Sequence, residues 1–245
     1  MAAAPPTETQ SATAPLLCIG HSHVACVARA AAAEGVPLRA FNFWELPGAI
    51  RQDGARPVFA AAILDALASH EGPVFSLIGG AAHVVMGMLV HPRRFDFVLP
   101  AEPDLPLDPA AEILPAQAVR QTIEALADEY LALMEELGRC CRGPMHHVEP
   151  PPPYADSARM HQDVPWGMFP DRCREVSPPA LRYKLWRVHS QVLREWCRRA
   201  GAHWVPAPAA SMDDAGFMRA PFYGDGAHAD TAYGALVLQQ MRERA

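Results

Sequence analysis

The sequence has no excess of basic residues and no long apolar run. Its 21 lysines and arginines are outnumbered by 27 aspartates and glutamates, which gives a formal net charge of -6 at pH 7. A protein that follows a nucleic-acid backbone needs a basic surface, so we expect no nucleic-acid partner. The longest apolar stretches, such as residues 84–90, are far shorter than the roughly 20 residues that cross a bilayer. We therefore expect no membrane partner either.

The chain also lacks a secretory leader and a cysteine framework. Residues 1–14 are mostly Ala, Pro, Thr and Gln, without the cationic start and apolar run of a signal peptide, and we expect a disordered tail there. The six cysteines include no C-x-x-C pair, which favours neither a zinc ribbon nor a disulfide framework. We therefore expect reduced thiols, a cytoplasmic location and no cofactor.

What is present is a chain of 245 residues, half of them apolar, which suffices for one domain over residues 15–245. Short apolar runs alternate with segments of helical spacing. We expect strands over residues 15–20, 37–44, 73–78, 145–148 and 202–205. We expect helices over residues 22–33, 57–69, 116–138, 179–199 and 231–244. This order predicts an α/β fold: a three-layer α/β/α sandwich around an open, mainly parallel sheet of about five strands.

Two proline-rich regions, residues 91–115 and 150–178, interrupt this alternation. Both are too long to be simple connections. Ligands of open parallel sheets bind beyond the carboxyl ends of the strands. The two regions either cover a pocket at that end or are surface excursions that prolines hold in place.

A serine follows the first predicted strand, in Gly20-His-Ser-His23. The unpaired N–H groups of a helix N-terminus stabilise a developing oxyanion, so Ser22 is a candidate nucleophile. Serine is also a favoured N-cap residue. Taken alone, Ser22 fits an ordinary helix cap better than a nucleophile.

An aspartate and a histidine three residues apart lie just before the last predicted helix, in Tyr223-Gly-Asp-Gly-Ala-His228. A serine nucleophile needs a base to accept its proton, and the base needs a carboxylate to fix its tautomer. One short loop supplies both groups. Taken alone, Asp225 fits a glycine-flanked turn and His228 a surface position. Together with Ser22, they indicate a catalytic triad.

These two segments resemble the first and last sequence blocks of the SGNH (GDSL-like) hydrolases. In that family a nucleophilic serine follows strand one, and D-x-x-H precedes the terminal helix. Gly20-His-Ser22 is similar to the first block and Asp225-Gly-Ala-His228 to the last. The resemblance implies a serine esterase in which Ser22 is the nucleophile, His228 the general base and Asp225 its orienting carboxylate. The serine lacks the G-x-S-x-G context of α/β-hydrolases.

The sequence departs from the family pattern in the block after the third strand. The family has a glycine there and, two residues later, an asparagine whose amide donates to the oxyanion. Here the block reads Gly79-Gly80-Ala81-Ala82-His83, so an alanine stands at the asparagine position. The resemblance leaves Gly80, Ala81 and His83 as candidate oxyanion or substrate-binding residues, with His83 as a replacement donor.

Two further positions concern the same oxyanion site. The family's other donors are the backbone N–H of the nucleophile, here Ser22, and that of a glycine after strand two. Gly48 is our candidate for this glycine, with Gly54 as the alternative. His21 stands where the GDSL motif has its aspartate, a position outside the triad.

Two other functions are compatible with these residues. The alanines at positions 81 and 82 suit a non-catalytic descendant that binds a carbohydrate or protein in the same pocket. His21 and His23 form an H-x-H pair like the one that binds metal in amidohydrolase barrels, which suits a metal-dependent hydrolase. Such a barrel needs eight strands and further metal ligands, and we expect about five strands here, so we expect no metal. We expect a small-molecule ester as substrate, and the breadth of the family includes acylated sugars and metabolites. The oligomeric state is not predicted.

Overall fold

The computed structural model describes residues 14–54, 56–164, 166 and 174–245. Its central sheet has the strand order β2-β1-β5-β8-β9, and every neighbouring pair is parallel. The strands are β1 (Leu16–Gly20), β2 (Leu38–Asn42), β5 (Val74–Leu77), β8 (Met145–Val148) and β9 (His203–Val205). The predicted fold class and these predicted strands are confirmed. The tail predicted for residues 1–14 lies outside the described residues, except for Ala14.

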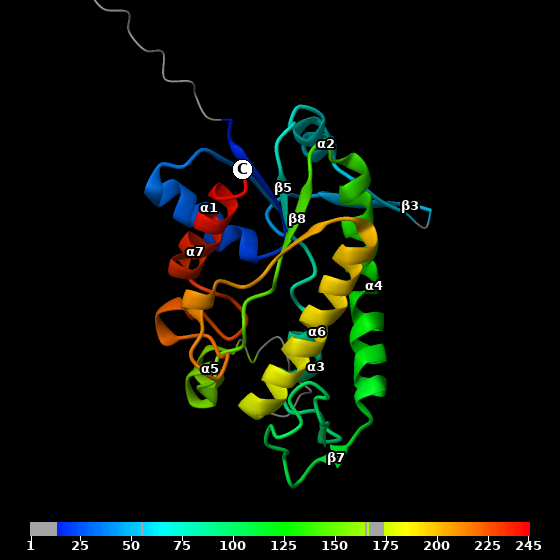
Figure 1. Cartoon of the computed structure of the whole chain (residues 1–245), viewed down its shortest axis with the longest axis vertical. Coiled ribbons are helices and arrows are strands. Elements are labelled where there is room, and N and C mark those ends of the chain that lie inside the picture. The colour runs from blue at the N-terminus through cyan, green and yellow to red at the C-terminus, as the bar shows by residue number, and fades with distance from the viewer. Residues whose placement is uncertain (1–13, 55, 165, 167–173) are drawn as a thin grey trace, which may run out of the picture.

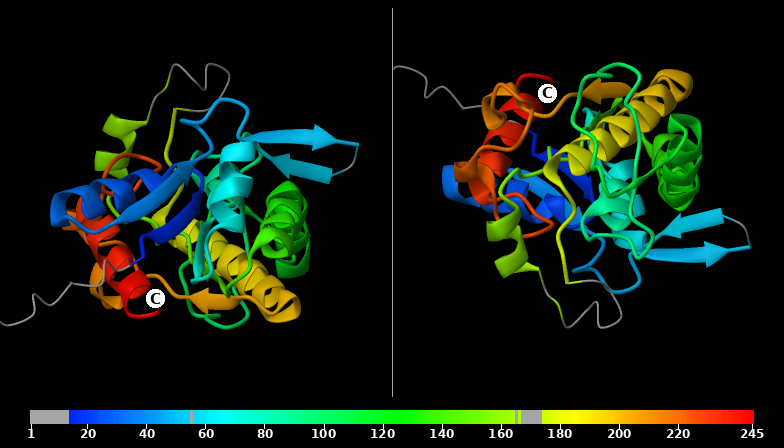
Figure 2. Two further views of the ribbon diagram at one scale, coloured as in Figure 1. Left: turned by 90° about the horizontal axis from the view of Figure 1, so that it is seen from above. Right: turned by 90° about the horizontal axis from the view of Figure 1, so that it is seen from below.

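Helices cover both faces of the sheet and so complete three layers (Figures 1 and 2). One face carries α1 (His23–Glu34) and α7 (Thr231–Arg242), and the other carries α2 (Ala61–Ala68), α4 (Ala116–Cys140) and α6 (Pro179–Ala200). The side chains of β1 alternate between the two cores, with Leu16 and Cys18 beneath α1 and α7, and Leu17 and Ile19 beneath α2 and α4. Because both faces are buried, this strand is a continuous apolar run in the sequence.

Two glycines permit the close approaches that position the carboxyl end of β1. A Cβ atom on Gly20 would lie 2.4 Å from the carbonyl oxygen of Leu77 in the neighbouring strand. A Cβ atom on Gly234 of α7 would lie 2.2 Å from the carbonyl oxygen of Cys26 in α1. Helices α1 and α7 therefore pack closely. The loop that precedes α7 lies beside the start of α1.

The structure differs from the sequence predictions between β2 and α4. A hairpin of β3 (Ile50–Asp53) and β4 (Arg56–Phe59) precedes α2, so the helix predicted over residues 57–69 is wrong at its first four positions. Pro57 and Phe59 are buried while the alternate residues are more exposed, which is the period of a strand. A short helix after β5, α3 (Ala82–Gly87), was not predicted.

The first irregular region, residues 91–115, is fastened to α6 by a buried ion pair. It contains β6 (Phe95–Asp96) and β7 (Glu112–Ile113), which pair in parallel. The ammonium of Lys184 contacts the Asp96 carboxylate, and both side chains are almost fully buried. Lys184 also donates to the carbonyl oxygen of Pro106 at 3.0 Å. Because a buried charge needs a partner, this pair specifies where the region packs.

The second irregular region, residues 150–178, contains α5 (Ser157–Asp163) and packs against Arg182 of α6. The buried Arg182 guanidinium donates to the carbonyl oxygens of Tyr154 at 2.6 Å and Ala155 at 3.2 Å. The short 3₁₀ turns η2 (Ala209–Ser211) and η3 (Ala220–Phe222) lead from β9 to the loop before α7.

Two further expectations concern membranes and thiols. Within the described ranges, no helix is long and apolar enough to cross a membrane. The five described cysteines are free. Cys173 lies outside the described residues.

Candidate active site

A wide pocket of about 650 Å³ lies at the carboxyl ends of β1, β2 and β5. Asn42 at the end of β2, the residues that follow β1 and β5, and the loop before α7 contribute to its wall. The polar and aromatic residues that line it include His21, Ser22, His23, Arg29, Asn42, Trp44, Glu45, Tyr130, Asp225 and His228, and Gly80 and Ala81 complete the side next to β5. The structure thus brings Ser22, Asp225 and His228 to one pocket from opposite ends of the chain.

Asp225 and His228 form a hydrogen-bonded pair within one turn. Nδ1 of His228 lies 2.9 Å from Oδ1 and 3.0 Å from Oδ2 of Asp225. Oδ1 also accepts the backbone N–H groups of Ala227 and His228, both at 2.9 Å. Burial alone raises the pKa of the Asp225 carboxyl, but the hydrogen bonds from the His228 ring and from these N–H groups outweigh burial and lower it. The carboxylate is therefore ionised and holds the ring in the tautomer with hydrogen on Nδ1.

Ser22 immediately precedes α1, with helical backbone angles of φ -49° and ψ -32°. Its side chain makes no capping hydrogen bond, so the helix-cap interpretation does not account for it. Among the described residues, no hydrogen bond joins its hydroxyl to His228, although both line the wide pocket. Catalytic hydrogen bonds are often long in the free enzyme and tighten when the substrate binds.

The predicted oxyanion residues occupy different places. Gly80 and Ala81 line the wide pocket. Gly48 does not: it lies in an exposed turn with φ +68°, between β2 and β3, and Gly54 lies farther away in the β3–β4 hairpin. Asn42 ends β2 at the wide pocket, so the pocket wall on this side is formed earlier in the chain than Gly48.

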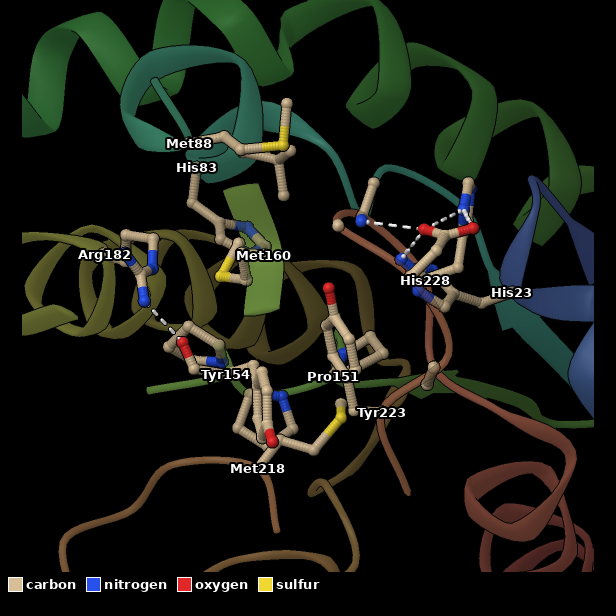
Figure 3. A pocket seen from close by; sticks show the side chains of 18 of the residues that line it. His23, His83, Met88, Pro151, Tyr154, Met160, Arg182, Met218, Tyr223 and His228 are labelled. Atoms are coloured by element: carbon tan, nitrogen blue, oxygen red, sulfur yellow. Dashed lines mark hydrogen bonds and ion pairs between the residues drawn. The ribbon is translucent and has the colours of Figure 1, made fainter. Parts of the chain in front are cut away.

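His83 does not line the wide pocket. Its side chain is buried, with 7% of its surface exposed, and does not face solvent as a surface residue would. Its Nδ1 lies 3.0 Å from Nδ1 of His189 on α6. The ring lines the smaller pocket described below (Figure 3).

His21 and His23 flank Ser22 and have different surroundings. Nδ1 of His21 accepts the backbone N–H of Gly79 at 3.3 Å, and burial lowers the pKa of this ring to about 4. The His23 ring centroid lies 5.8 Å from that of His228, and burial, with the nearby His228, lowers its pKa to about 3. Both rings are neutral at pH 7.

The H-x-H pair does not belong to a larger set of ligands. In the part of the chain that the structure describes, no group of three or more His, Cys, Asp or Glu side chains is arranged to hold a metal ion. The sheet has five parallel strands and no barrel closure. Among the described residues, the His21–His23 pair therefore has no third metal ligand beside it.

Five polar or aromatic residues of the wide pocket were not predicted from the sequence: Arg29, Asn42, Trp44, Glu45 and Tyr130. The Asn42 amide donates to Oε1 of Glu45 at 2.9 Å and its Oδ1 accepts the N–H of Trp44 at 3.1 Å. Trp44 is 74% exposed. A polar residue at the end of a predicted strand was a usable signal for Asn42. Tyr130 gave no local signal, because it lies in the middle of α4.

A second, smaller pocket adjoins the first behind His228 (Figure 3). We call it the apolar pocket. It has a volume of about 60 Å³. Methionine, tyrosine and proline form much of its wall, through Met88, Met160, Met218, Tyr154, Tyr223 and Pro151–Pro153. The side chains of His83 and Arg182 also line it. His23, Gly80, Val84, Asp225 and His228 line both pockets, so the two are neighbours across the histidine.

Comparison with known proteins finds structural neighbours only. No protein-family model matches the chain, and no curated protein matches it. A structure from Streptococcus pneumonia, provisionally named a platelet activating factor, is 14% identical with a TM-score of 0.49, over 96% of this chain and 86% of that one. An arylesterase from Agrobacterium tumefaciens str. C58, also provisionally named, is 16% identical with a TM-score of 0.39, over 94% of this chain and 100% of that one. The native aryl esterase of M. Smegmatis is 15% identical with a TM-score of 0.40, over 94% of this chain and 99% of that one.

Proposed function

We propose that the protein is a serine hydrolase of the SGNH (GDSL-like) type, which cleaves esters through an acyl intermediate on Ser22. The Asp225–His228 pair carries this proposal, because its ring and carboxylate are 2.9 Å apart at the pocket that Ser22 also lines. The sequence blocks around these residues support the same assignment. The free cysteines of the described chain support a cytoplasmic location.

In the proposed reaction, Nε2 of His228 accepts the hydroxyl proton of Ser22 while Oγ attacks the ester carbonyl carbon. Asp225 stabilises the imidazolium that forms. The imidazolium gives its proton to the alcohol oxygen as the C–O bond breaks, which leaves Ser22 acylated. A water molecule, deprotonated by the same ring, then attacks the acyl carbon, releases the acid and restores the serine.

The two pockets favour an ester with a small apolar part and a larger polar part. The apolar pocket is narrow, and methionine, tyrosine and proline side chains form much of its wall, beside His83 and Arg182. The wide pocket is about ten times larger and presents Asn42, Glu45 and Arg29. Short acyl chains are apolar, so we assign the acyl group to the narrow pocket and a polar alcohol to the wide one. An acylated sugar or metabolite has this composition.

Covalent labelling tests the nucleophile. We expect a fluorophosphonate probe to label the purified protein at Ser22, as peptide mapping will show, and Ser22→Ala to abolish both the label and ester hydrolysis. Ser69→Ala is the matched control, because Ser69 lies outside both pockets and bonds to the backbone of α2. A wild-type protein that stays unlabelled under conditions that label a known esterase contradicts the proposal.

A non-catalytic binding protein is the second candidate. The absence of a Ser22–His228 hydrogen bond among the described residues, and the alanine at position 81, favour it. Under this alternative, no ester is hydrolysed, while a sugar or another polar ligand still binds equally well to the wild-type protein and to Ser22→Ala. Calorimetric titration of both proteins separates the two candidates.

A further inference from the structure

An oxyanion on a substrate bound at Ser22 needs more donors than the predicted residues supply. The backbone N–H of Ser22 has no partner in the described part of the chain and is available. Ala81 has no side-chain donor, and Gly48 does not line the wide pocket. Removal of one oxyanion donor typically costs about 10²- to 10³-fold in turnover, so a replacement donor would matter.

The His21 ring can donate a hydrogen bond into the wide pocket, and a contact with the backbone determines which tautomer it adopts. Its Nδ1 accepts the N–H of Gly79 at 3.3 Å, which requires the lone pair on Nδ1. The neutral ring therefore carries its hydrogen on Nε2. No hydrogen bond within the described residues engages Nε2, and this atom is not among the buried polar atoms without a partner. It is thus accessible from the wide pocket that His21 lines.

The His21 ring is also held in one orientation. Phe43 contacts it edge-on, with ring centroids 5.1 Å apart at 90°. Tyr130 contacts it in the same way, at 5.2 Å and 84°. A donor that is fixed before the reaction needs no reorganisation when charge develops.

We propose that the Nε2–H of His21 donates a hydrogen bond to the oxyanion formed when Ser22 attacks the substrate, in place of the asparagine amide that this chain lacks. This inference rests on the proposed serine-hydrolase function. Burial keeps the ring uncharged at neutral pH, since its pKa is about 4. A neutral imidazole that stabilises negative charge is an established catalytic arrangement.

The test compares two substitutions at position 21. His21→Phe keeps an aromatic ring against Phe43 and Tyr130 but removes the donor, and we expect kcat to fall by about 10²- to 10³-fold with KM little changed. His21→Gln keeps an amide N–H near the position of Nε2, and we expect it to retain at least about ten times the kcat of His21→Phe. His203→Phe, at an exposed position of the edge strand β9 and outside both pockets, is the control and should leave kcat unchanged.

A rescue experiment separates donation from packing. Ala81→Asn restores an amide in the place where the family carries one, and in the His21→Phe background we expect it to raise kcat at least about tenfold. A His21→Phe enzyme within about threefold of wild type overturns the inference, as does a loss that neither Gln at position 21 nor Asn at position 81 reduces. If the wild-type protein itself is unlabelled at Ser22 and hydrolyses no ester, the proposed function has failed instead.

Discussion

Asp225 has two tasks within a single turn. Its carboxylate contacts Nδ1 of His228 and also accepts the backbone N–H groups of Ala227 and His228. The three-residue spacing is therefore a physical requirement, because the turn that brings the N–H groups to the carboxylate also brings the ring to it. Gly224 permits this geometry, since a Cβ atom there would lie 2.8 Å from the carbonyl oxygen of His228.

The orienting role of Asp225 predicts a large loss of activity in Asp225→Asn. The asparagine Oδ1 still accepts the same backbone N–H groups, so the turn persists. Its NH₂ group, however, faces Nδ1 and favours the wrong tautomer of His228. We expect kcat to fall by about 10³- to 10⁴-fold, with a melting temperature close to that of the wild type.

Asp213→Asn provides a matched control for this prediction. Oδ1 of Asp213 accepts the N–H groups of Ala215 at 3.0 Å and Phe217 at 2.9 Å in a similar turn, outside both pockets. We expect it to leave kcat unchanged. A loss of less than about tenfold in Asp225→Asn would refute the orienting role.

For single residues, the sequence predicted contacts between residues that are close together along the chain. Asp225 and His228 are three positions apart, and their contact depends on one turn. Tyr130 reaches the wide pocket only because α4 packs over Gly79, whose added Cβ would lie 2.9 Å from Cβ of Tyr130. No local pattern encodes such a contact. Gly48 lies outside the wide pocket for a similar reason, since the pocket wall depends on where β2 ends in space.

At the scale of elements, the crossing of α1 and α7 determines whether the two ends of the chain meet. Gly234 is the closest point of this crossing, because its Cα faces the Cys26 carbonyl of α1. Asp230 then caps α7, and the loop that ends there contains His228. The distance between the histidine and Ser22 therefore depends on the absence of a side chain at position 234.

We accordingly expect Gly234→Ala to destabilise the protein, although alanine is the better helix former. Overpacking of this kind costs about 1–3 kcal/mol, and the separation of the helices should also lower kcat/KM. Gly138→Ala in α4 is the comparison, because an added Cβ there meets only Sδ of Met145, at 3.8 Å. That variant should gain about 0.5–1 kcal/mol from helix propensity. Urea unfolding of both variants measures the difference in their free energies of unfolding. Equal stabilities would contradict the prediction that Gly234→Ala overpacks the crossing of α1 and α7.

Elements buried on both sides were the easiest to predict. Every residue of β1 and β5 is buried, so both strands stand out as apolar runs between turns. The β3–β4 hairpin was missed because only alternate positions of β4 are buried and its Pro57 suggested a helix start. Helix α3 was missed because its six residues are too few to show a helical period.

At the scale of the whole molecule, three buried histidines connect the sheet to the helices on one face. His147 lies on β8, His189 on α6 and His83 on α3. Nδ1 of His147 lies 3.1 Å from Oγ of Ser76, and His83 and His189 contact each other. Burial lowers the pKa of His147 to about 3 and that of His189 to about 4, and it lowers the pKa of His83 well below the ordinary value. All three are neutral in the folded protein at pH 7.

These three rings, together with His21 and His23, whose pKa values burial also lowers, predict that the protein loses stability in weak acid. In the unfolded chain the three rings regain a pKa near 6.5, so below that pH the unfolded state binds more protons and the free energy of unfolding falls. Each ring contributes about 1.4 kcal/mol per pH unit between 6.5 and its folded pKa. Three rings together remove about 4 kcal/mol per unit, against a total stability of about 5–15 kcal/mol.

We therefore expect the free energy of unfolding to fall steadily from pH 6.5 to pH 5, with an uptake of about three protons from these rings at pH 5. Urea unfolding at pH 7.5, 6.5, 5.5 and 5 measures the slope. His147→Gln tests the assignment, because it removes one titrating group and should lower the uptake by about one proton. A free energy of unfolding that stays constant from pH 7 to pH 5 would mean that these rings titrate alike in both states, and that their burial has no energetic cost in acid.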